Sequence, residues 1–201
     1  MKRHIHLIIF LFASAGGCQT KIPNFNGDAA FAHLVAQCDF GPRNPGSVGH
    51  QKALEYYLNI LSPLADSVMT QPFIETMPRT KEKVEMHNVI AQFNPDAKKQ
   101  IMLSAHWDTR PWGDRSLSVM RKNQPILGAN DGASGVAVLL SLAKILHDNP
   151  QDIGVNLVLF DAEDYGTSGD SWSYCKGSQY FSKHLPIPLP EYAINLDMIG
   201  D

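Results

Sequence analysis

The sequence predicts an α/β fold with a mostly parallel core sheet. Continuous apolar runs at 100–105 and 153–160 are typical of strands that are covered on both faces. Segments with the apolar spacing of a helix stand between and after these strands, at 135–147 and around 179–184. Strands that alternate with helices favour parallel pairing, because each helix returns the chain to the edge at which the next strand begins.

The other elements are expected from caps, turn formers and periodicity. Asp28 can cap a first helix and Ser47 a second, and the loop between these helices is rich in Gly and Pro. Residues 109–130 form a long polar stretch, and in a compact domain a loop of this length is often functional. In chain order we expect helices over 29–38, 47–61, 135–147 and 179–184, and strands over 67–75, 84–93, 100–105, 153–160 and 193–196.

Length and charge limit the classes of protein to which the chain can belong. At 201 residues it is long enough for one domain with a substantial core, and its 44% hydrophobic and 18% charged residues are ordinary for a globular protein. The formal net charge is -3, and the sequence has no Lys/Arg run, internal repeat or low-complexity tract. Nothing in this balance favours a nucleic-acid partner.

The N-terminus has the pattern of a targeting segment. Lys2 and Arg3 precede an apolar run over 7–13, which is far shorter than the ~20 residues needed to span a bilayer. Ala15-Gly16-Gly17-Cys18 resembles a bacterial lipobox, with Ala15 at the position where leucine is usual.

This resemblance implies an exported bacterial lipoprotein. Residues 1–17 would be the signal peptide, Cys18 the lipidated residue and 18–27 a tether. The lipid on Cys18 would hold the protein to a membrane surface, facing the periplasm or on the cell surface, without a spanning helix. The alternative is an ordinary cleaved signal peptide in which Cys18 is incidental.

Cys38 and Cys175 are the other two cysteines. In an oxidising compartment they could form a disulfide, and they could equally be two buried thiols. Neither belongs to a CxxC pair, so the sequence indicates no structural zinc site at these residues.

Acidic residues and a histidine follow three of the expected strands. The apolar run over 155–160 leads directly into Asp161-Ala162-Glu163-Asp164, in which three carboxylates occupy four positions. Like charges at this spacing raise each other's pKa and cost stability, and a divalent cation removes that cost. The strand over 100–105 ends in His106-Trp107-Asp108, and the last strand ends near Asp197. Because ligands bind beyond the carboxyl ends of parallel strands, we expect one metal site at this edge of the sheet.

Two pairs of residues fit complementary roles in a metal site. His106 and Asp108 are two residues apart at a strand end, so their side chains share a face, and one can bind a metal while the other orients it. Glu163 and Asp164 are adjacent and point in different directions, which suits one metal ligand and one general base. The plainer interpretation is that all four are solvated side chains in turns.

Asp131 stands among the small residues of Gly128-Ala129-Asn130-Asp131-Gly132-Ala133-Ser134-Gly135, directly before a helix. Small side chains allow the backbone to approach a ligand closely. Asp131 can also be a helix cap, and so can Asp197. The segment lacks the GxxxxGK pattern, which excludes a phosphate-binding loop of that type.

Four segments together resemble one family in order and spacing. They are Ala105-His106-Trp107-Asp108-Thr109, Gly128 to Gly135, Phe160 to Gly166 and Asn195 to Asp201, and they resemble the zinc-dependent aminopeptidase and glutaminyl cyclase superfamily. Segments 40–47 and 107–112 are most similar to its bacterial glutaminyl-peptide cyclotransferase lipoproteins. The resemblance covers 38–201. It implies a three-layer α/β sandwich with a mixed, mostly parallel central sheet, in which 28–201 form a catalytic domain truncated at its C-terminus.

The resemblance also implies roles for particular residues. The family residues that match Asp131 and Asp164 bind zinc, although many relatives have Glu at the second position, and the match to Glu163 is the general acid and base. In the cyclases, which typically hold one zinc, the match to Asp197 hydrogen-bonds near the base and the substrate amide. In the two-zinc aminopeptidases, the matches to His106 and Asp197 bind a second ion.

Two further expectations concern the pocket and the zinc shell. Trp172 is expected to line the substrate pocket, since the cyclases have a Trp shortly after the acid pair. The family supplies a further His ligand beyond the Asn-Leu-Asp-Met motif, whereas no His follows Asp197 in this sequence. We therefore expect a fragment of a longer enzyme, with loss of the metal or an unusual ligand as alternatives.

The function that the resemblance implies is that of a zinc-dependent glutaminyl-peptide cyclotransferase, which forms N-terminal pyroglutamate and releases ammonia. One alternative is a two-zinc aminopeptidase of the same superfamily. Another is a non-catalytic, lipid-anchored protein on the same fold. The expected partners are peptide or protein N-termini and a membrane surface reached through lipidated Cys18, with no nucleic acid.

Overall fold

The computed structural model describes residues 22–77, 79–114 and 116–200. Its helices are α1 (Gly27–Asp39), α2 (Val48–Leu61), α3 (Gly135–Asp148) and α4 (Lys176–Lys183), and its strands are β1 (Ser67–Thr76), β2 (Lys83–Phe93), β3 (Gln100–His106), β4 (Gly154–Phe160) and β5 (Tyr192–Asn195). Short turns of other helix types, η1 (Val119–Arg121), η2 (Ala129–Ser134) and η3 (Ser171–Ser173), lie in the connections. The helices and strands expected from the sequence are present. The expected signal peptide, Cys18 and the first residues of the tether lie outside the described residues.

The five strands form one open, mixed sheet in the order β1-β2-β4-β3-β5. β2 pairs antiparallel with β1 and β4, whereas β3 pairs parallel with β4 and β5. Strands β1, β3, β4 and β5 therefore run in one direction and β2 in the other, which confirms the expected mixed, mostly parallel sheet. All seven residues of the central strand β4 are buried, as its continuous apolar run predicted.

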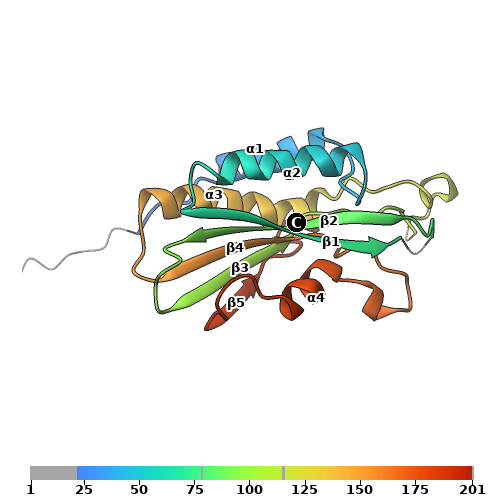
Figure 1. The fold of residues 1–201 in the computed structure, drawn as a ribbon. Coiled ribbons are helices and arrows are strands. Elements are labelled where there is room, and N and C mark those ends of the chain that lie inside the picture. Colours follow the sequence, from blue (N-terminus) through green and yellow to red (C-terminus); the bar gives the residue numbers. More distant parts are fainter. Residues whose placement is uncertain (1–21, 78, 115, 201) are drawn as a thin grey trace, which may run out of the picture.

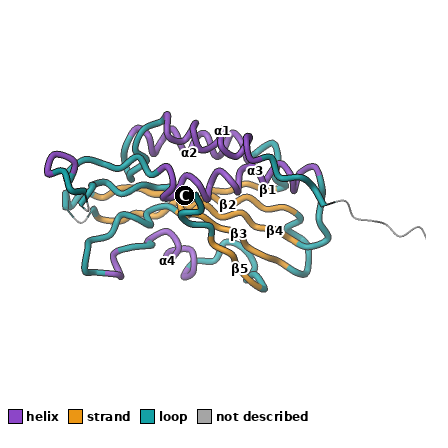
Figure 2. The backbone as a smooth tube through the Cα atoms, turned by 180° about the vertical axis from the view of Figure 1, so that it is seen from behind, coloured by secondary structure: helices purple, strands orange, loops and turns teal. Residues whose placement is uncertain are grey.

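Helices cover both faces of this sheet (Figure 1). α2 and α3 pack on one face, α1 packs against α3, and α4 lies on the other face, as the view from behind also shows (Figure 2). Successive residues of β4 contribute to opposite cores: Leu157 and Leu159 pack with Leu139 of α3, and Val158 packs with Phe181 of α4. This arrangement confirms the three-layer α/β sandwich.

The first two helices differ in how their starts match the prediction. Ser47 caps α2, because its hydroxyl oxygen accepts a hydrogen bond from the His50 N–H at 3.1 Å. The cap of α1 is Asn26 and not Asp28, since the Asn26 side chain accepts from the Ala29 N–H at 3.0 Å. α1 begins at Gly27, so Asp28 lies inside its first turn, where a carboxylate is stabilised by the positive end of the helix dipole.

The stretch Ala129–Asp148, which contains η2 and α3, has the length and apolar composition of a membrane-spanning helix. In the fold it serves as the core helix. Seven residues of α3 are buried, and its apolar side chains belong to the main core with β3 and β4. Burial inside the domain therefore explains why this segment is apolar.

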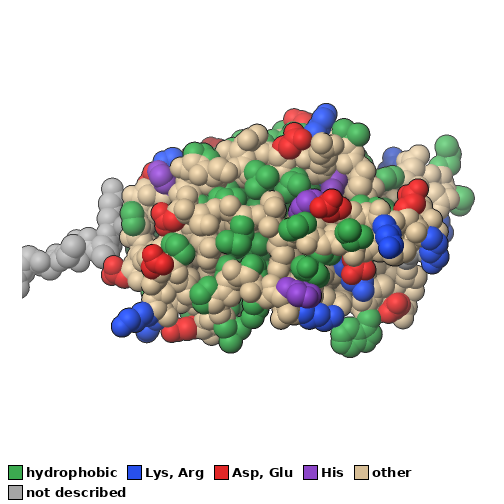
Figure 3. Space-filling view, in the orientation of Figure 1, with side chains coloured by type: hydrophobic (Ala, Val, Ile, Leu, Met, Phe, Trp, Pro, Cys, Tyr) green, Lys and Arg blue, Asp and Glu red, His purple; other side chains and the backbone are tan. Residues whose placement is uncertain are grey.

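The edge strand β5 is the most open part of the sheet, because all of its residues are exposed. Tyr192 and Ile194 keep exposed fractions of 54% and 49%. Over the face shown in Figure 3, charged side chains of both signs are interspersed with apolar ones. An exposed edge strand with apolar side chains offers its unpaired backbone groups to another strand.

Cys38 and Cys175 are free thiols. Of the two alternatives that the sequence left open, the structure therefore has the unpaired one. Burial raises the pKa of both thiols, so both are protonated at neutral pH.

Candidate active site

Three parallel strands end side by side at the candidate site. His106 is the last residue of β3, Asp161 directly follows β4, and Asp197 follows shortly after β5. Because β3 lies between β4 and β5, His106 is flanked by both acidic segments. Asp131 comes from η2, which contacts β3. The structure thus brings the three strand ends that the sequence singled out to one edge of the sheet.

A kinked turn brings Asp131 to His106. Within η2, Asp131 has φ -94° and ψ 95°, and Gly132 has φ 85°, which is a left-handed conformation that favours glycine. A Cβ at Gly132 would lie 2.4 Å from the carbonyl oxygen of His106 and 2.8 Å from its ring carbon Cε1. Glycine is therefore required for close packing of this turn against His106, and the approach of a ligand to the small residues of this segment stays a prediction.

His106, Asp131 and Asp197 form a group with the spacing of metal ligands. His106 Nε2 lies 3.0 Å from Asp131 Oδ1 and 3.5 Å from Asp197 Oδ1, and the ligand atoms of all three lie within 4.8 Å of one another. Neither contact has the geometry of a hydrogen bond, and within the described part of the chain Nε2 has no hydrogen-bond partner. A buried imidazole and two carboxylates that converge without bonding one another are donors that suit zinc.

The other ring nitrogen of His106 faces Asp108. His106 Nδ1 lies 3.4 Å from Asp108 Oδ1, and both side chains are fully buried. Burial by itself would lower the pKa of His106, but the carboxylates of Asp108, Asp131 and Asp197 outweigh it and raise this pKa well above its usual value. These carboxylates favour positive charge on His106, and a cation at Nε2 would supply that charge in place of the proton.

Hydrogen bonds to the main chain hold the acidic turn after β4. The backbone of Ala162 is left-handed, with φ 55°. Asp108 accepts from the N–H of Glu163 at 2.8 Å and from the N–H of Asp164 at 3.2 Å. The N–H of Cys175, at the start of α4, donates to the carbonyl oxygen of Glu163 at 3.0 Å. Asp108 thus orients the acid pair in addition to facing His106.

The fully buried carboxylate of Asp161 holds the start of this turn. It lies 2.9 Å from His50 Nε2 and accepts from the N–H of His87 at 2.7 Å and the N–H of Ala162 at 2.8 Å. The His50 ring in turn stacks on Trp107, with 4.3 Å between ring centroids. Sequence reasoning found no role for Asp161, because His50 comes 111 residues earlier in the chain and no local pattern links the two.

The environment of Glu163 and Asp164 disfavours their charged forms. Burial raises the pKa of Glu163, and the surrounding carboxylates act in the same direction. Burial and the charges of Asp108 and Asp131 raise the pKa of Asp164 to about 7. Asp164 Oδ2 is buried and has no hydrogen-bond partner within the described ranges. The electrostatic cost that the sequence predicted is therefore present, and an orphaned carboxylate oxygen beside Asp131 fits a bound cation.

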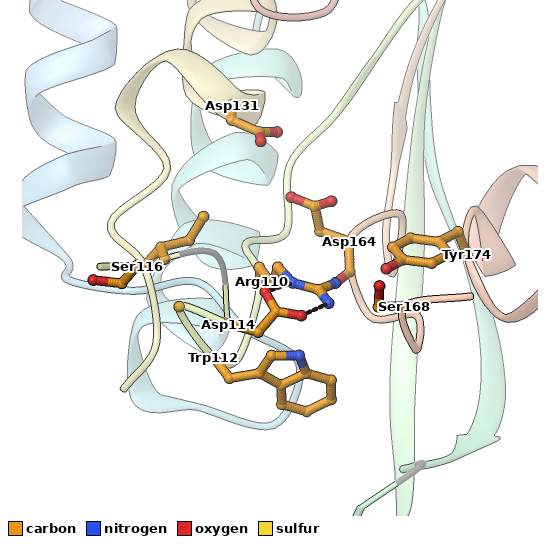
Figure 4. A pocket seen from close by; sticks show the side chains of 10 residues that line it. Arg110, Trp112, Asp114, Ser116, Asp131, Asp164, Ser168 and Tyr174 are labelled. Carbon is orange, nitrogen blue, oxygen red and sulfur yellow. Dashed lines mark hydrogen bonds and ion pairs between the residues drawn. The ribbon is translucent and has the colours of Figure 1, made fainter. Parts of the chain in front are cut away.

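A cleft of about 350 Å³ opens beside the acidic cluster. Figure 4 shows Asp131 and Asp164 in its wall, with their carboxylates facing each other. Its size is that of a small-ligand site. Trp172, which was expected to line the substrate pocket, is 79% exposed and lies outside this lining, so its contact with substrate stays a prediction. The lining residues are Arg110, Trp112, Gly113, Asp114, Ser116, Ile126, Asp131, Asp164, Ser168 and Tyr174.

Arg43 supports the site, although the sequence analysis did not single it out. The residue is fully buried, and its guanidinium joins the loop before α2 to the segments that flank His106 and Asp131. A cation inside the turn-rich segment 40–47 was the available signal, but its burial depends on segments far away in the chain. The guanidinium donates to the carbonyl oxygens of Trp107 at 3.1 Å, Gln37 at 3.3 Å, Leu127 at 3.1 Å and Gly128 at 2.8 Å.

The fold and the site together define an α/β protein in which a cluster of residues that could hold a metal ion lies at the carboxyl ends of its strands. The chain belongs to peptidase family M28, whose model matches residues 88–201. Among curated proteins it is 30% identical to the glutaminyl-peptide cyclotransferase of Drosophila melanogaster over 149 residues, which are 72% of this chain and 38% of that protein.

Two kinds of enzyme occur among the solved structures that are similar to this chain. A Zn-dependent exopeptidase from Parabacteroides distasonis has a TM-score of 0.85 and 36% identity, and the match covers 90% of this chain and 64% of that one. The glutaminyl cyclase of Tannerella forsythia has a TM-score of 0.84 and 37% identity, and the match covers 89% of this chain and 63% of that one. The chain spans less than two thirds of the length of each of these relatives.

Proposed function

We propose that the protein is a zinc-dependent glutaminyl-peptide cyclotransferase, which converts an N-terminal glutamine into pyroglutamate and releases ammonia. The observation that carries this proposal is the position of the Glu163–Asp164 pair. Asp108 holds the pair beside the cleft, and Asp164 lies in the cleft wall opposite Asp131. The similarity to an insect cyclotransferase and to a bacterial glutaminyl cyclase supports it. The substrates would be the N-termini of peptides or proteins.

Asp131 and Asp164 would hold the zinc ion. Their carboxylates face each other in the wall of the cleft (Figure 4), and the buried, unpaired oxygen of Asp164 offers a ligand atom. When bound, the ion would act as a Lewis acid that polarises the γ-carboxamide of the substrate.

Glu163 would carry the proton. Burial raises its pKa toward neutrality, which suits a group that accepts and then donates a proton. Glu163 takes a proton from the α-amine as that nitrogen forms a bond to Cδ, the carbonyl carbon of the side-chain carboxamide. It then delivers the proton to the amide nitrogen as the carbon–nitrogen bond breaks and ammonia leaves. Asp197, whose charge adds to the raised pKa of Glu163, would accept a hydrogen bond from that amide nitrogen.

A two-zinc aminopeptidase is the second candidate, and one observation favours it. His106, Asp131 and Asp197 converge within 4.8 Å, so these three residues could hold a second ion. In this reaction Glu163 would take a proton from the attacking water, and the products would be a free amino acid and a shortened peptide. The exopeptidase relative supports this candidate.

Substrate and metal stoichiometry separate the two candidates. A cyclase loaded with zinc holds one ion and converts a glutaminyl peptide to its pyroglutamyl product, followed by mass spectrometry. An aminopeptidase holds two ions and releases leucine from a leucyl peptide. Release of leucine without cyclisation would contradict the first proposal.

The proton carrier is tested by Glu163→Gln. Loss of a general acid and base is expected to lower kcat by at least about 100-fold. The matched control is Glu55→Gln on the exposed surface of α2, which should keep full activity. Equal rates for the Glu163→Gln variant and the parent would remove Glu163 from the mechanism.

Export and lipid anchoring complete the proposal. The basic start, the short apolar run and the sequence Ala15-Gly16-Gly17-Cys18 support cleavage after residue 17 and lipidation of Cys18. In a bacterial host, Cys18→Ser should move the protein from the membrane fraction to the soluble fraction and abolish labelling by radioactive palmitate. Membrane attachment that survives the substitution would contradict this anchor.

A further inference from the structure

A charged side chain joins the two loops that form the cleft. Arg110 follows Asp108 by two residues and reaches from the loop after β3 to the turn after β4 (Figure 4). Its Nε and Nη2 donate to the two carboxylate oxygens of Asp114, at 2.8 and 2.6 Å. Its Nη1 donates to the carbonyl oxygens of Asp164 at 2.9 Å and Gly166 at 3.2 Å. Every nitrogen of the guanidinium therefore has an acceptor within the protein.

This pair is more constrained than an ordinary surface ion pair. The side chain of Arg110 is only 12% exposed and that of Asp114 25%. The guanidinium also lies over the rings of Trp112 and Tyr174, at 5.4 and 5.5 Å from their centroids. A bidentate pair that is partly buried among aromatic rings keeps one geometry, whereas an exposed pair samples many.

The bonds from Arg110 complete the support of the acid pair. The N–H groups of Glu163 and Asp164 both donate to Asp108, and the carbonyl oxygen of Glu163 accepts from the N–H of Cys175. The carbonyl oxygen of Asp164 accepts from Arg110. All four polar main-chain groups of the pair are thus bonded, and Arg110 supplies the last of these bonds from the loop that lines the cleft.

We propose that the Arg110–Asp114 pair is a positioning device that sets the direction of the Asp164 carboxylate in the candidate zinc site. The side-chain direction of Asp164 follows its backbone, and Arg110 holds the peptide plane on its C-terminal side while Asp108 holds the plane on its N-terminal side. Four of the five N–H groups of the guanidinium are bonded within the protein, and two of these bonds reach the turn that carries Asp164, so Arg110 acts through Asp164. The effect of the Arg110–Asp114 pair on catalysis rests on the proposed function, whereas its effect on zinc affinity does not.

Zinc affinity, measured by competition with a chelator, tests this inference without any activity assay. Arg110→Met keeps the aliphatic stem and removes the donors, and it is expected to weaken zinc binding about 10- to 100-fold, as loss of a group that orients a metal ligand does. Arg110→Lys keeps the charge and one donor, so a smaller loss is expected. Arg121→Met, at an exposed arginine on the same loop, is the matched control and should leave the affinity unchanged.

Asp114→Asn provides a second, milder variant. It keeps the shape of the side chain but loses the charge, and it is expected to weaken zinc binding less than Arg110→Met does. If Arg110→Met does not fold, Asp114→Asn and Arg110→Lys decide the question. Parental zinc affinity in the folded variants would overturn the inference.

Kinetics on glutaminyl peptides separate positioning from substrate contact. A positioning role predicts a lower kcat at saturating zinc with little change in KM, and partial recovery in Arg110→Lys. A rise in KM alone would instead indicate that Arg110 contacts the substrate. If the parent binds zinc but cyclises no glutaminyl peptide, the proposed function fails, while the zinc affinities still decide the role of Arg110.

Discussion

Replacing Arg43 by methionine should destabilise the protein strongly without touching a residue of the acidic cluster. The guanidinium is fully buried, and its four hydrogen bonds all go to backbone carbonyl oxygens. Methionine fills much of the same volume but offers no donor. The four carbonyl groups would then lose their partners, and the segment at Leu127 and Gly128 would lose its side-chain link to the loop before α2.

The size of this effect follows from which carbonyl groups can reach water. The bonds to Trp107 and Gln37 are buried, whereas those to Leu127 and Gly128 are partly buried, so water can replace the latter pair. An orphaned buried carbonyl costs roughly 1–3 kcal/mol, which gives about 2–6 kcal/mol for two. Removing a buried cation recovers part of this cost. We therefore expect a loss of about 3 kcal/mol, a large share of the 5–15 kcal/mol that is usual for a domain.

Urea unfolding followed by tryptophan fluorescence measures this loss, since Trp107 is buried next to Arg43. The control is Arg121→Met at an exposed position, for which a change within about 0.5 kcal/mol is expected. A change below about 1 kcal/mol for Arg43→Met would refute the assignment of Arg43 as a buried hydrogen-bond centre.

Three further predictions follow from the site. His50→Ala leaves the buried Asp161 carboxylate with only the main-chain N–H groups of His87 and Ala162 and should cost about 1–3 kcal/mol in thermal unfolding, whereas a loss like that of the exposed control His147→Ala would contradict the pairing. Gly132→Ala adds a Cβ 2.4 Å from the His106 carbonyl oxygen, so it should lose more stability and zinc affinity than Gly41→Ala, which has a similar φ and open space; equal losses would mean that backbone conformation alone matters. Zinc at 100 times its dissociation constant should stabilise the protein by about 2.7 kcal/mol in calorimetry, and a shift that persists in Asp164→Asn would contradict Asp164 as a ligand.

Local patterns were sufficient for the elements of the fold. The apolar run over 153–160 predicted a strand buried on both faces, and β4 is buried along its whole length. Ser47 was recognised as a cap because its side chain acts within one turn of the helix. The cap of α1 was placed at Asp28 instead of Asn26, since two suitable residues lie within three positions and sequence alone does not set where the first helical residue falls.

The candidate site was predictable in part. His106, Asp131 and Asp197 were each marked by residue type and by position near the end of a strand or the start of a helix, and the fold brings them together. Trp172 was expected in the pocket from its distance after the acid pair; the residue is 79% exposed, and its contact with substrate stays a prediction. Loop length and direction decide where such a residue points, and spacing along the chain does not contain that information.

The sequence by itself determined the order and type of the elements and the positions of the acidic residues, because apolar periodicity and strand ends are properties of neighbouring residues. The tertiary structure alone decided which distant groups meet. Asp161 pairs with His50, Arg43 joins loops on three segments, and Arg110 holds the carbonyl of Asp164. Such pairs depend on the order of strands in the sheet and on the packing of loops at its edge, so a buried polar partner can come from any segment that the fold brings close.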